Sequence, residues 1–403
     1  MSSFLQLAAM LIIILVAAKL AGYLSSHLGQ PSVLGELLVG ILLGPSVFNI
    51  TRLPFVTDSH LHEVILHLGE LGVLLIMFLA GLELHLDELT SNLKVAAYAG
   101  VLGVVLPVLL GWGIGVMFGI DHAASLFLGL TMGATSVSIS VQTLMELKAL
   151  RTRVGLSLLG AAVFDDVLVI ILLSIFLALV SGGNGFVQLL FIFGKILLFI
   201  ALSLGIGRWL LPRMVRKVGK MHISQGSVVL ALVIMLFYGI GAELVGGMAA
   251  ITGSFIAGLM FSRTIEKSHI EPGLIAISYG FFVPIFFISI GLSLNLREVP
   301  LSALWMLVTV SVMAIIGKWL GSGVGARIAG FSWLESIQLG AGMISRGEVG
   351  LIVGAVGLSA GLVSNSEFSA IIGMVVITTV VTPPLLKSLF PKSKPVQKET
   401  AGQ

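Results

Sequence analysis

Hydrophobic residues along the chain gather in runs of about 20, and short polar stretches separate these runs. A helix needs about 20 apolar residues to cross the ~30 Å hydrocarbon core of a bilayer. The runs predict thirteen transmembrane spans, at residues 4–24, 33–50, 61–84, 95–118, 123–145, 154–180, 187–210, 224–242, 247–262, 274–294, 301–326, 334–360 and 367–389. Residues 391–403 form a polar tail that we expect to be disordered, which leaves 1–390 as a single membrane domain.

Composition supports an all-α polytopic membrane protein. Apolar residues make up 57% of the 403-residue chain and charged residues only 10%, whereas soluble domains contain roughly 25% charged residues. So few charges cannot cover a soluble surface, so most of the chain must face lipid. Cysteine is absent, which excludes disulfides, thiol nucleophiles and thiolate metal sites.

Basic residues in the connections predict the orientation, because positively charged loops stay in the cytoplasm. Alternate connections place sixteen basic residues on one side and only Arg52 and Arg297 on the other. The sixteen are Lys94, Lys148, Arg151, Arg153, Arg208, Arg213, Arg216, Lys217, Lys220, Arg263, Lys267, Arg327, Lys387, Lys392, Lys394 and Lys398. We therefore expect an external N-terminus and a cytoplasmic C-terminus, and we attribute the pI near 9.2 to this asymmetry and not to nucleic-acid binding.

Five ionisable residues lie near the middle of the predicted spans, where each costs several kcal/mol unless it is paired or lines a wet cavity. They are Asp165, Asp166, Lys318, Arg346 and Glu348. Neighbouring residues on a helix point about 100° apart, so one aspartate can be neutralised by a fixed cation while the other faces a cavity. Two cations against three carboxylates leave a deficit of one positive charge. A proton and a monovalent cation would compete to fill it.

Two of the predicted spans contain clusters of small polar residues that are typical of interrupted helices. The fifth span has the sequence GATSVS at 133–138, and the twelfth has GAG at 340–342 followed by SRGEVG at 345–350. Each is the fifth member of a six-span set if spans one to six and eight to thirteen are inverted repeats joined by span seven. Matching broken helices in inverted repeats indicate the ion site of a secondary transporter.

Several segments of the chain resemble the cation:proton antiporter-2 family, with the closest likeness to NapA-type sodium/proton antiporters. These segments are QPSVLGE at 30–36, FLAGLE at 78–83, GAAVFDD at 160–166, PIFF at 284–287, GK at 317–318 and SRGEVGLI at 345–352. They occur in the family's order over essentially the whole chain.

The resemblance implies a thirteen-helix NhaA-type fold with two inverted repeats and two broken helices that cross at mid-membrane. A core within residues 93–181 and 300–390 would move by an elevator motion against a scaffold, or dimerisation, part within 1–90 and 224–296. Helix 187–210 would link the two repeats. The resemblance also implies a homodimer in the inner membrane of a bacterium.

The resemblance further implies roles for individual residues. Asp166 would be the carboxylate shared by cation and proton, and Asp165 would form an ion pair with Lys318. Thr135 and Ser136 would lie in the unwound stretch near the ion, while Arg346 and Glu348 would supply the charges of the other break. A lysine that releases its proton when its partner turns toward the cation would make transport electrogenic.

We therefore expect a transporter, not an enzyme, that exchanges sodium or lithium for protons, interacts with membrane lipids and needs no cofactor. Potassium/proton exchange, or mixed sodium/proton-potassium exchange, is the main alternative within the family. An intramembrane aspartyl protease is a remote alternative, because that chemistry needs carboxylates from two separate helices. For Glu36, Glu70 and Glu83, nearer the span ends, we expect structural hydrogen bonding.

Overall fold

The fold is that of the computed structural model, and it consists entirely of helices and connections in the residues that the structure describes. Those residues are 2–54, 56–58, 60–84, 92–180, 185–221, 224–264, 266–293, 297, 304–347, 350, 353–354, 357–358 and 361–390. Ten helices, counting consecutive helical pieces as one, are long and apolar enough to cross a membrane. The chain is thus a multi-pass membrane protein.

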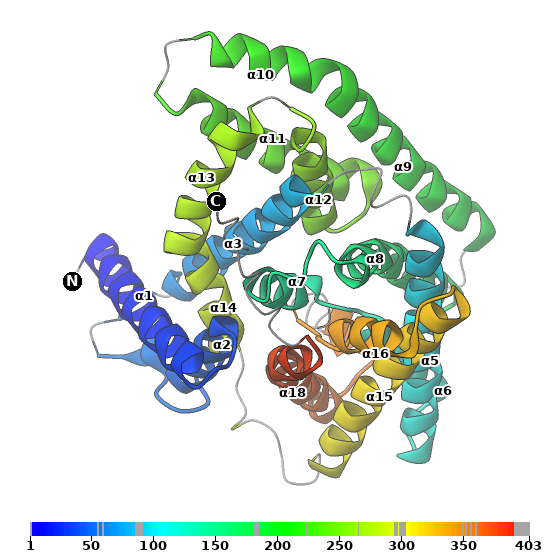
Figure 1. The fold of residues 1–403 in the computed structure, drawn as a ribbon. Helices are drawn as coiled ribbons and strands as arrows, with labels where there is room; N and C mark the ends of the chain where they lie inside the picture. The colour runs from blue at the N-terminus through cyan, green and yellow to red at the C-terminus, as the bar shows by residue number, and fades with distance from the viewer. Residues whose placement is uncertain are drawn as a thin grey trace, which may run out of the picture.

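One group of helices comes from the start and the middle of the chain (Figure 1). Its members are α1 (Ser3–His27), α2 (Ser32–Leu43), α3 (Leu61–Glu83), α11 (Gly226–Gly241), α12 (Ala250–Phe261), α13 (Lys267–Ile277) and α14 (Val283–Leu292). Helix α3 packs against α12 and α14, and α2 packs against α1 and α14. Small residues allow these approaches: a Cβ at Gly40 of α2 would lie 2.8 Å from the Ile288 carbonyl of α14. We call this set the first helix group.

A second helix group contains segments that precede α11 and segments that follow α14 in the sequence. It contains α5 (Leu93–Met117), α6 (His122–Gly133), α7 (Val137–Glu146), α8 (Arg153–Val180), α15 (Leu304–Ile328), α16 (Trp333–Gly342) and α18 (Asn365–Leu389). Helix α5 packs against α6, α8 and α15, while α15 also packs against α16 and α18. Glycines of α15 face the backbone of α5, so that a Cβ at Gly325 would meet Ala99 at 2.8 Å. Close backbone packing of this kind replaces the hydrophobic driving force that lipid does not provide.

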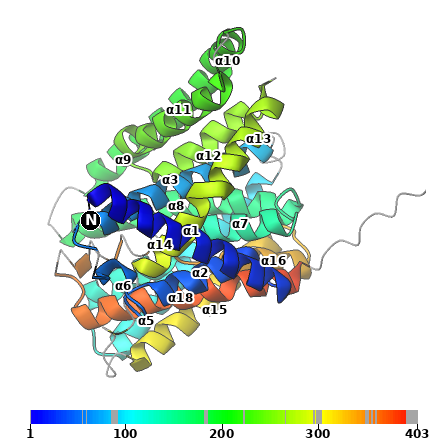
Figure 2. The ribbon, with the colours of Figure 1, turned by 90° about the vertical axis from the view of Figure 1, so that its left-hand side faces the viewer.

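The continuous helical segment between α8 and α11 is longer than the sequence predicts. It runs through α9 (Gly185–Gly205), a π-helical turn (Ile206–Leu210) and α10 (Leu211–Gly219), whereas the apolar run predicts 187–210. Figure 2 shows α9 and α10 along one edge of the molecule, with α10 at its end. The helix continues because Leu211 and Val215 are buried although basic residues on its other face interrupt the apolar run.

Other boundaries also differ from the apolar runs. Helix α2 ends at Leu43 and not near residue 50, because Pro45 follows and cannot donate a backbone hydrogen bond. The helix at the tenth predicted span begins at Lys267, seven residues before the predicted 274. The apolar run does not reveal this start, because the first turns of the helix are polar on one side. Helices α2 and α12 are 12 residues each, shorter than a full crossing requires.

Labelling of single cysteines tests the predicted orientation in this cysteine-free chain. We expect Gly183→Cys, between α8 and α9, to react with a membrane-impermeant maleimide added outside the cell. Met221→Cys, which follows α10 and replaces an exposed side chain, should react only after the cytoplasmic face is opened. The parent protein contains no cysteine and should not react, so it is the control for nonspecific labelling. The reverse pattern would contradict the orientation. Residue 183 lies outside the described residues.

Candidate ion-binding site at two broken helices

Both predicted helix interruptions are present, and they lie against each other. The first separates α6 from α7 at residues 134–136, and the second follows α16 at residues 343–347. The backbone N–H of Ser136 donates to the Ser345 carbonyl at 2.9 Å, and the Ser345 hydroxyl donates to the Ser136 carbonyl. The Ser140 hydroxyl adds a bond of 2.5 Å to the Gly342 carbonyl. The two breaks therefore form one hydrogen-bonded unit.

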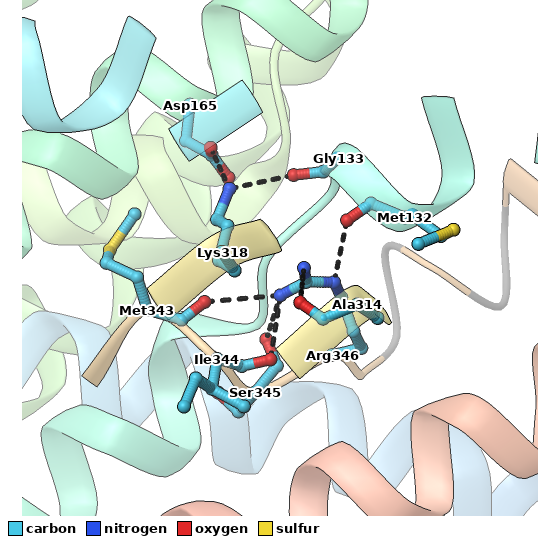
Figure 3. Close-up of polar contacts among 9 residues, drawn as sticks. All are labelled: Met132, Gly133, Asp165, Ala314, Lys318, Met343, Ile344, Ser345 and Arg346. Carbon is cyan, nitrogen blue, oxygen red and sulfur yellow. Dashed lines mark hydrogen bonds and ion pairs between the residues drawn. The ribbon is translucent and has the colours of Figure 1, made fainter. Parts of the chain in front are cut away.

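Arg346 lies within the second break and is completely buried. Its Nε donates to the Met132 carbonyl at 2.9 Å, and its Nη1 donates to the Ile344 carbonyl at 2.7 Å. Longer bonds, of 3.2 to 3.4 Å, reach the carbonyls of Met343, Ser345 and Ala314. Figure 3 shows these carbonyls converging on the guanidinium. Carbonyls at helix C-terminal ends carry partial negative charge, so Arg346 stabilises the ends of α6 and α16 together.

Two threonines of α18 hold the backbone of Arg346 in place. The Arg346 N–H donates to the Thr378 hydroxyl at 3.2 Å, and the Thr379 hydroxyl donates to the Arg346 carbonyl. Both threonines are buried. The non-helical backbone is thereby satisfied inside the protein, as it must be at membrane depth.

Lys318 of α15 is also completely buried, and it joins the first break to α8. Its ammonium forms an ion pair with Asp165 Oδ1, whose side chain is likewise at 0% exposure. The same ammonium donates to the Gly133 carbonyl at 2.8 Å, at the C-terminal end of α6. Lys318 thus neutralises one carboxylate and one helix end at once. Removal of either partner without a replacement that can hydrogen-bond the other would be strongly destabilising.

Asp166, the next residue along α8, has a different environment. Its side chain is half-buried, and its Oδ2 accepts a hydrogen bond of 3.1 Å from the Thr252 hydroxyl. Thr252 belongs to α12 of the first helix group, so Asp166 lies where the two helix groups meet. The two adjacent aspartates therefore face different surroundings, as the 100° rotation between them predicts.

Buried oxygen atoms without hydrogen bonds occur beside the ion pair. Asp165 Oδ2 and the Thr135 hydroxyl make no hydrogen bond of good geometry in the described part of the chain, but they lie close enough to interact with each other. Ser136 contributes mainly to the joint between the breaks, through its backbone, and its hydroxyl lies 3.1 Å from that of Ser138. Carboxylate and hydroxyl oxygens are suitable ligands for a hard monovalent cation.

The structure brings together most of the residues that the sequence singled out. Asp165, Asp166, Lys318, Arg346, Thr135 and Ser136 all lie at or beside the paired breaks, while Glu348 lies outside the described residues. The Arg346 guanidinium donates to backbone carbonyls in the described contacts, and its charge also acts on the nearby Asp165 without a direct ion pair. Sequence reasoning missed Thr252, Ser140, Thr378 and Thr379, since isolated hydroxyls in apolar spans are too common to stand out.

Comparison with known proteins gives matches over almost the whole chain. The family model described as sodium/hydrogen exchanger, transmembrane, matches residues 12–392. The chain is 41% identical over 378 residues to the Na(+)/H(+)-K(+) antiporter GerN of Bacillus cereus, covering 94% of this chain and 95% of that protein. It is 33% identical to an Na(+)/H(+) antiporter of Enterococcus hirae, with 94% and 96% covered.

Solved structures show the same fold. The sodium proton antiporter MjNhaP1 of Methanocaldococcus jannaschii superimposes with a TM-score of 0.69 at 17% sequence identity. The match covers 95% of this chain and 96% of that one. Because the identity is low, this likeness describes the fold alone.

Replacement of Arg346 tests its structural role. We expect Arg346→Ala to lower the stability in detergent by several kcal/mol, because each buried carbonyl that loses its donor costs about 1–3 kcal/mol. Arg346→Lys should rescue little, since one ammonium cannot reach the carbonyls of both helix ends. Arg213→Ala, which removes an exposed arginine bonded to its own helix, is the control for thermal unfolding. An unchanged melting temperature in Arg346→Ala would contradict the role.

Proposed function

Because this chain belongs to the sodium/hydrogen exchanger family, we propose that it exchanges monovalent cations for protons across the membrane. The observation that carries the proposal is the contrast between two adjacent aspartates at the paired helix breaks. Asp165 is fixed by Lys318, whereas Asp166 is half-buried at the meeting of the helix groups. A carboxylate in such a position can bind a proton or a cation, but not both.

Sodium, with lithium, is the cation that we propose first. The names of the relatives support sodium, and that of GerN also includes potassium. A K(+)/H(+) antiporter subunit of Bacillus subtilis, KhtU, is 28% identical over 331 residues. Potassium exchange, alone or mixed with sodium exchange, is therefore the alternative.

Asp166 is the proposed shared site, with Thr135, Ser136 and Asp165 as neighbouring oxygen donors. When a cation binds Asp166, Asp165 can turn toward the cation, because apart from the neighbouring Thr135 hydroxyl its Oδ2 has no partner in the described part of the chain. Lys318 then loses its partner in a desolvated site and releases a proton. Two protons would exchange for one cation, so that each cycle would move net charge.

The proposed architecture has thirteen crossings in the NhaA-type arrangement of two inverted repeats. Three features support it: ten long helices, the two short helices α2 and α12, and a break in the fifth member of each repeat. We assign the first helix group to the proposed scaffold (1–90 and 224–296) and the second helix group to the proposed core (93–181 and 300–390). An elevator movement of the core would then carry Asp166 past Thr252.

The proposed assembly is a homodimer, with the N-terminus outside and the C-terminus in the cytoplasm. Helix α1 supports it, because it lies at the edge of the molecule and exposes Phe4, Ile12, Val16 and Leu20. A second copy, or lipid, would cover these side chains. Contacts between the scaffolds of two copies would also hold the scaffold in place while the core moves.

The aspartyl protease alternative receives no support from the geometry. Its two carboxylates must converge from separate helices on one substrate bond. Here both aspartates lie on α8, and the carboxylate of Asp165 is bound by an ammonium.

Asp166→Asn tests the shared carboxylate. We expect it to abolish exchange in proteoliposomes without loss of folding, because asparagine keeps the volume and removes the charge. In the wild type, the cation concentration for half-maximal exchange should rise as the pH falls, up to about tenfold per pH unit where protons hold the site. A half-saturating concentration that does not change with pH would rule out a shared site.

Lys318→Gln tests the origin of net charge movement. Glutamine can still donate a hydrogen bond to Asp165, but it cannot carry a proton, so some exchange should persist. The response to membrane potential should disappear, whereas each charge moved by the wild type changes the driving force by about 2.3 kcal/mol per 100 mV. The measurement is proton flux under imposed potassium-diffusion potentials, with Na+ as the transported cation. If wild-type flux ignores the potential, Lys318 is only a structural partner of Asp165.

A further inference from the structure

A second group of polar side chains lines a cavity of about 400 Å³ between the two helix groups. Glu36, Glu83 and Lys19 reach it from α1 to α3, and Gln142 and Glu146 reach it from α7. Helix α7 begins at the first break and ends at this cavity, and its ten residues span about 15 Å. In the proposed orientation, the cavity faces the cytoplasm.

Most charged groups of the cavity already have partners. Glu146 accepts hydrogen bonds from the Ser32 N–H at 2.7 Å and from the Ser32 hydroxyl at 2.6 Å. Lys19 donates to the Tyr279 carbonyl at 2.7 Å. Glu83 lies 3.9 Å from Arg151. These side chains therefore have partners; for Glu83 the sequence predicts structural hydrogen bonding, whereas its partner here is an arginine at ion-pair distance.

Glu36 does not follow that prediction. It is only 6% exposed, and within the described residues its carboxylate has neither a hydrogen bond nor an ion pair. A buried carboxylate without compensation is costly. Lys19, the cation on the same cavity wall, is not within ion-pair distance in the described structure.

Gln142 supplies a second buried oxygen without a partner. The residue is 5% exposed, and its Nε2 donates to Glu146 Oε1 at 3.2 Å. That bond fixes the amide orientation and leaves Oε1, which has no hydrogen-bond partner among the described residues. Glu36 and Gln142 thus offer one carboxyl oxygen and one amide oxygen from opposite helix groups. The C-terminal end of α7 adds partial negative charge at the same place.

We propose that Glu36 and Gln142 form a second site for a monovalent cation, separate from Asp166, in this cavity between the helix groups. The proposal rests on the proposed function, since the transported cation would be its ligand. Because the two oxygens belong to different helix groups, the site exists only while those groups keep this alignment. A cation arriving from the cytoplasm would be held here before it reaches Asp166.

Sidedness of transport tests the site. We expect Glu36→Gln to raise the half-saturating Na+ concentration about tenfold in everted vesicles, where the cation meets the cytoplasmic face. A tenfold change corresponds to the loss of ~1.4 kcal/mol of binding free energy. The maximal rate, and the half-saturating concentration in right-side-out vesicles, should change less than about twofold. Gln142→Met should weaken cytoplasmic Na+ use in the same direction, and Glu36→Asp should restore most of it.

Matched controls separate this site from general effects. Glu63→Gln removes an exposed carboxylate of α3 outside the cavity. It should leave the half-saturating Na+ concentration unchanged at both faces of the membrane. An equal shift on both faces, a fall in maximal rate alone, or no shift in Glu36→Gln would each overturn the proposal. A wild type that exchanges no cation would instead contradict the proposed function.

Binding without transport provides an independent measurement. A hydrophobic carbodiimide modifies carboxyl groups in poorly hydrated surroundings, and peptide mass spectrometry locates the adduct. In an Asp166→Asn background, we expect Na+ to slow modification of Glu36, while choline at the same ionic strength does not. Equal modification rates in Na+ and choline would overturn the second site whatever the outcome at Asp166.

Discussion

The constraint on which this structure depends is that a helix cannot stop inside a membrane unless its free backbone groups find partners within the protein. Two helices stop here, and their carbonyl ends meet. Lys318 and Arg346 bind those ends through the carbonyls of Gly133, Met132 and Ile344. Hydroxyls of α7 and α18 bind two more carbonyls of the second break, those of Gly342 and Arg346. The buried cations therefore stabilise the ends of the broken helices, apart from any role in transport.

This constraint also explains why the two aspartates differ. The ammonium that binds the end of α6 is within reach of Asp165 and fixes that carboxylate, while the Arg346 guanidinium donates to backbone carbonyls of the described residues. Asp166, rotated by about 100° on α8, points instead to the boundary with α12, where the Thr252 hydroxyl is its partner across the helix groups. One carboxylate thus belongs to the framework. The other lies where the surroundings can change.

Much of this site could be predicted from the sequence because charges and glycine-serine clusters are rare within apolar runs. Asp165, Asp166, Lys318 and both breaks stand out for that reason. The partners of Arg346 could not be predicted, since every residue has a carbonyl and only the fold decides which ones converge. Thr252 and Gln142 look like ordinary span residues. The apolar run does not predict that the helix continues to the end of α10, because basic residues on one face of α10 lower its hydrophobicity.

The position of the polar contacts between the helix groups bears on how they could move. Within each group, glycines bring backbones into direct contact, as at Gly40 and Gly325, so a shift there would separate closely packed surfaces. Between the groups, the bonds from Ser32 to Glu146 lie at the edge of an open cavity. Water can replace such bonds, so breaking each costs only about 0.5–1.5 kcal/mol. Relative movement is therefore easiest along the boundary that contains Asp166.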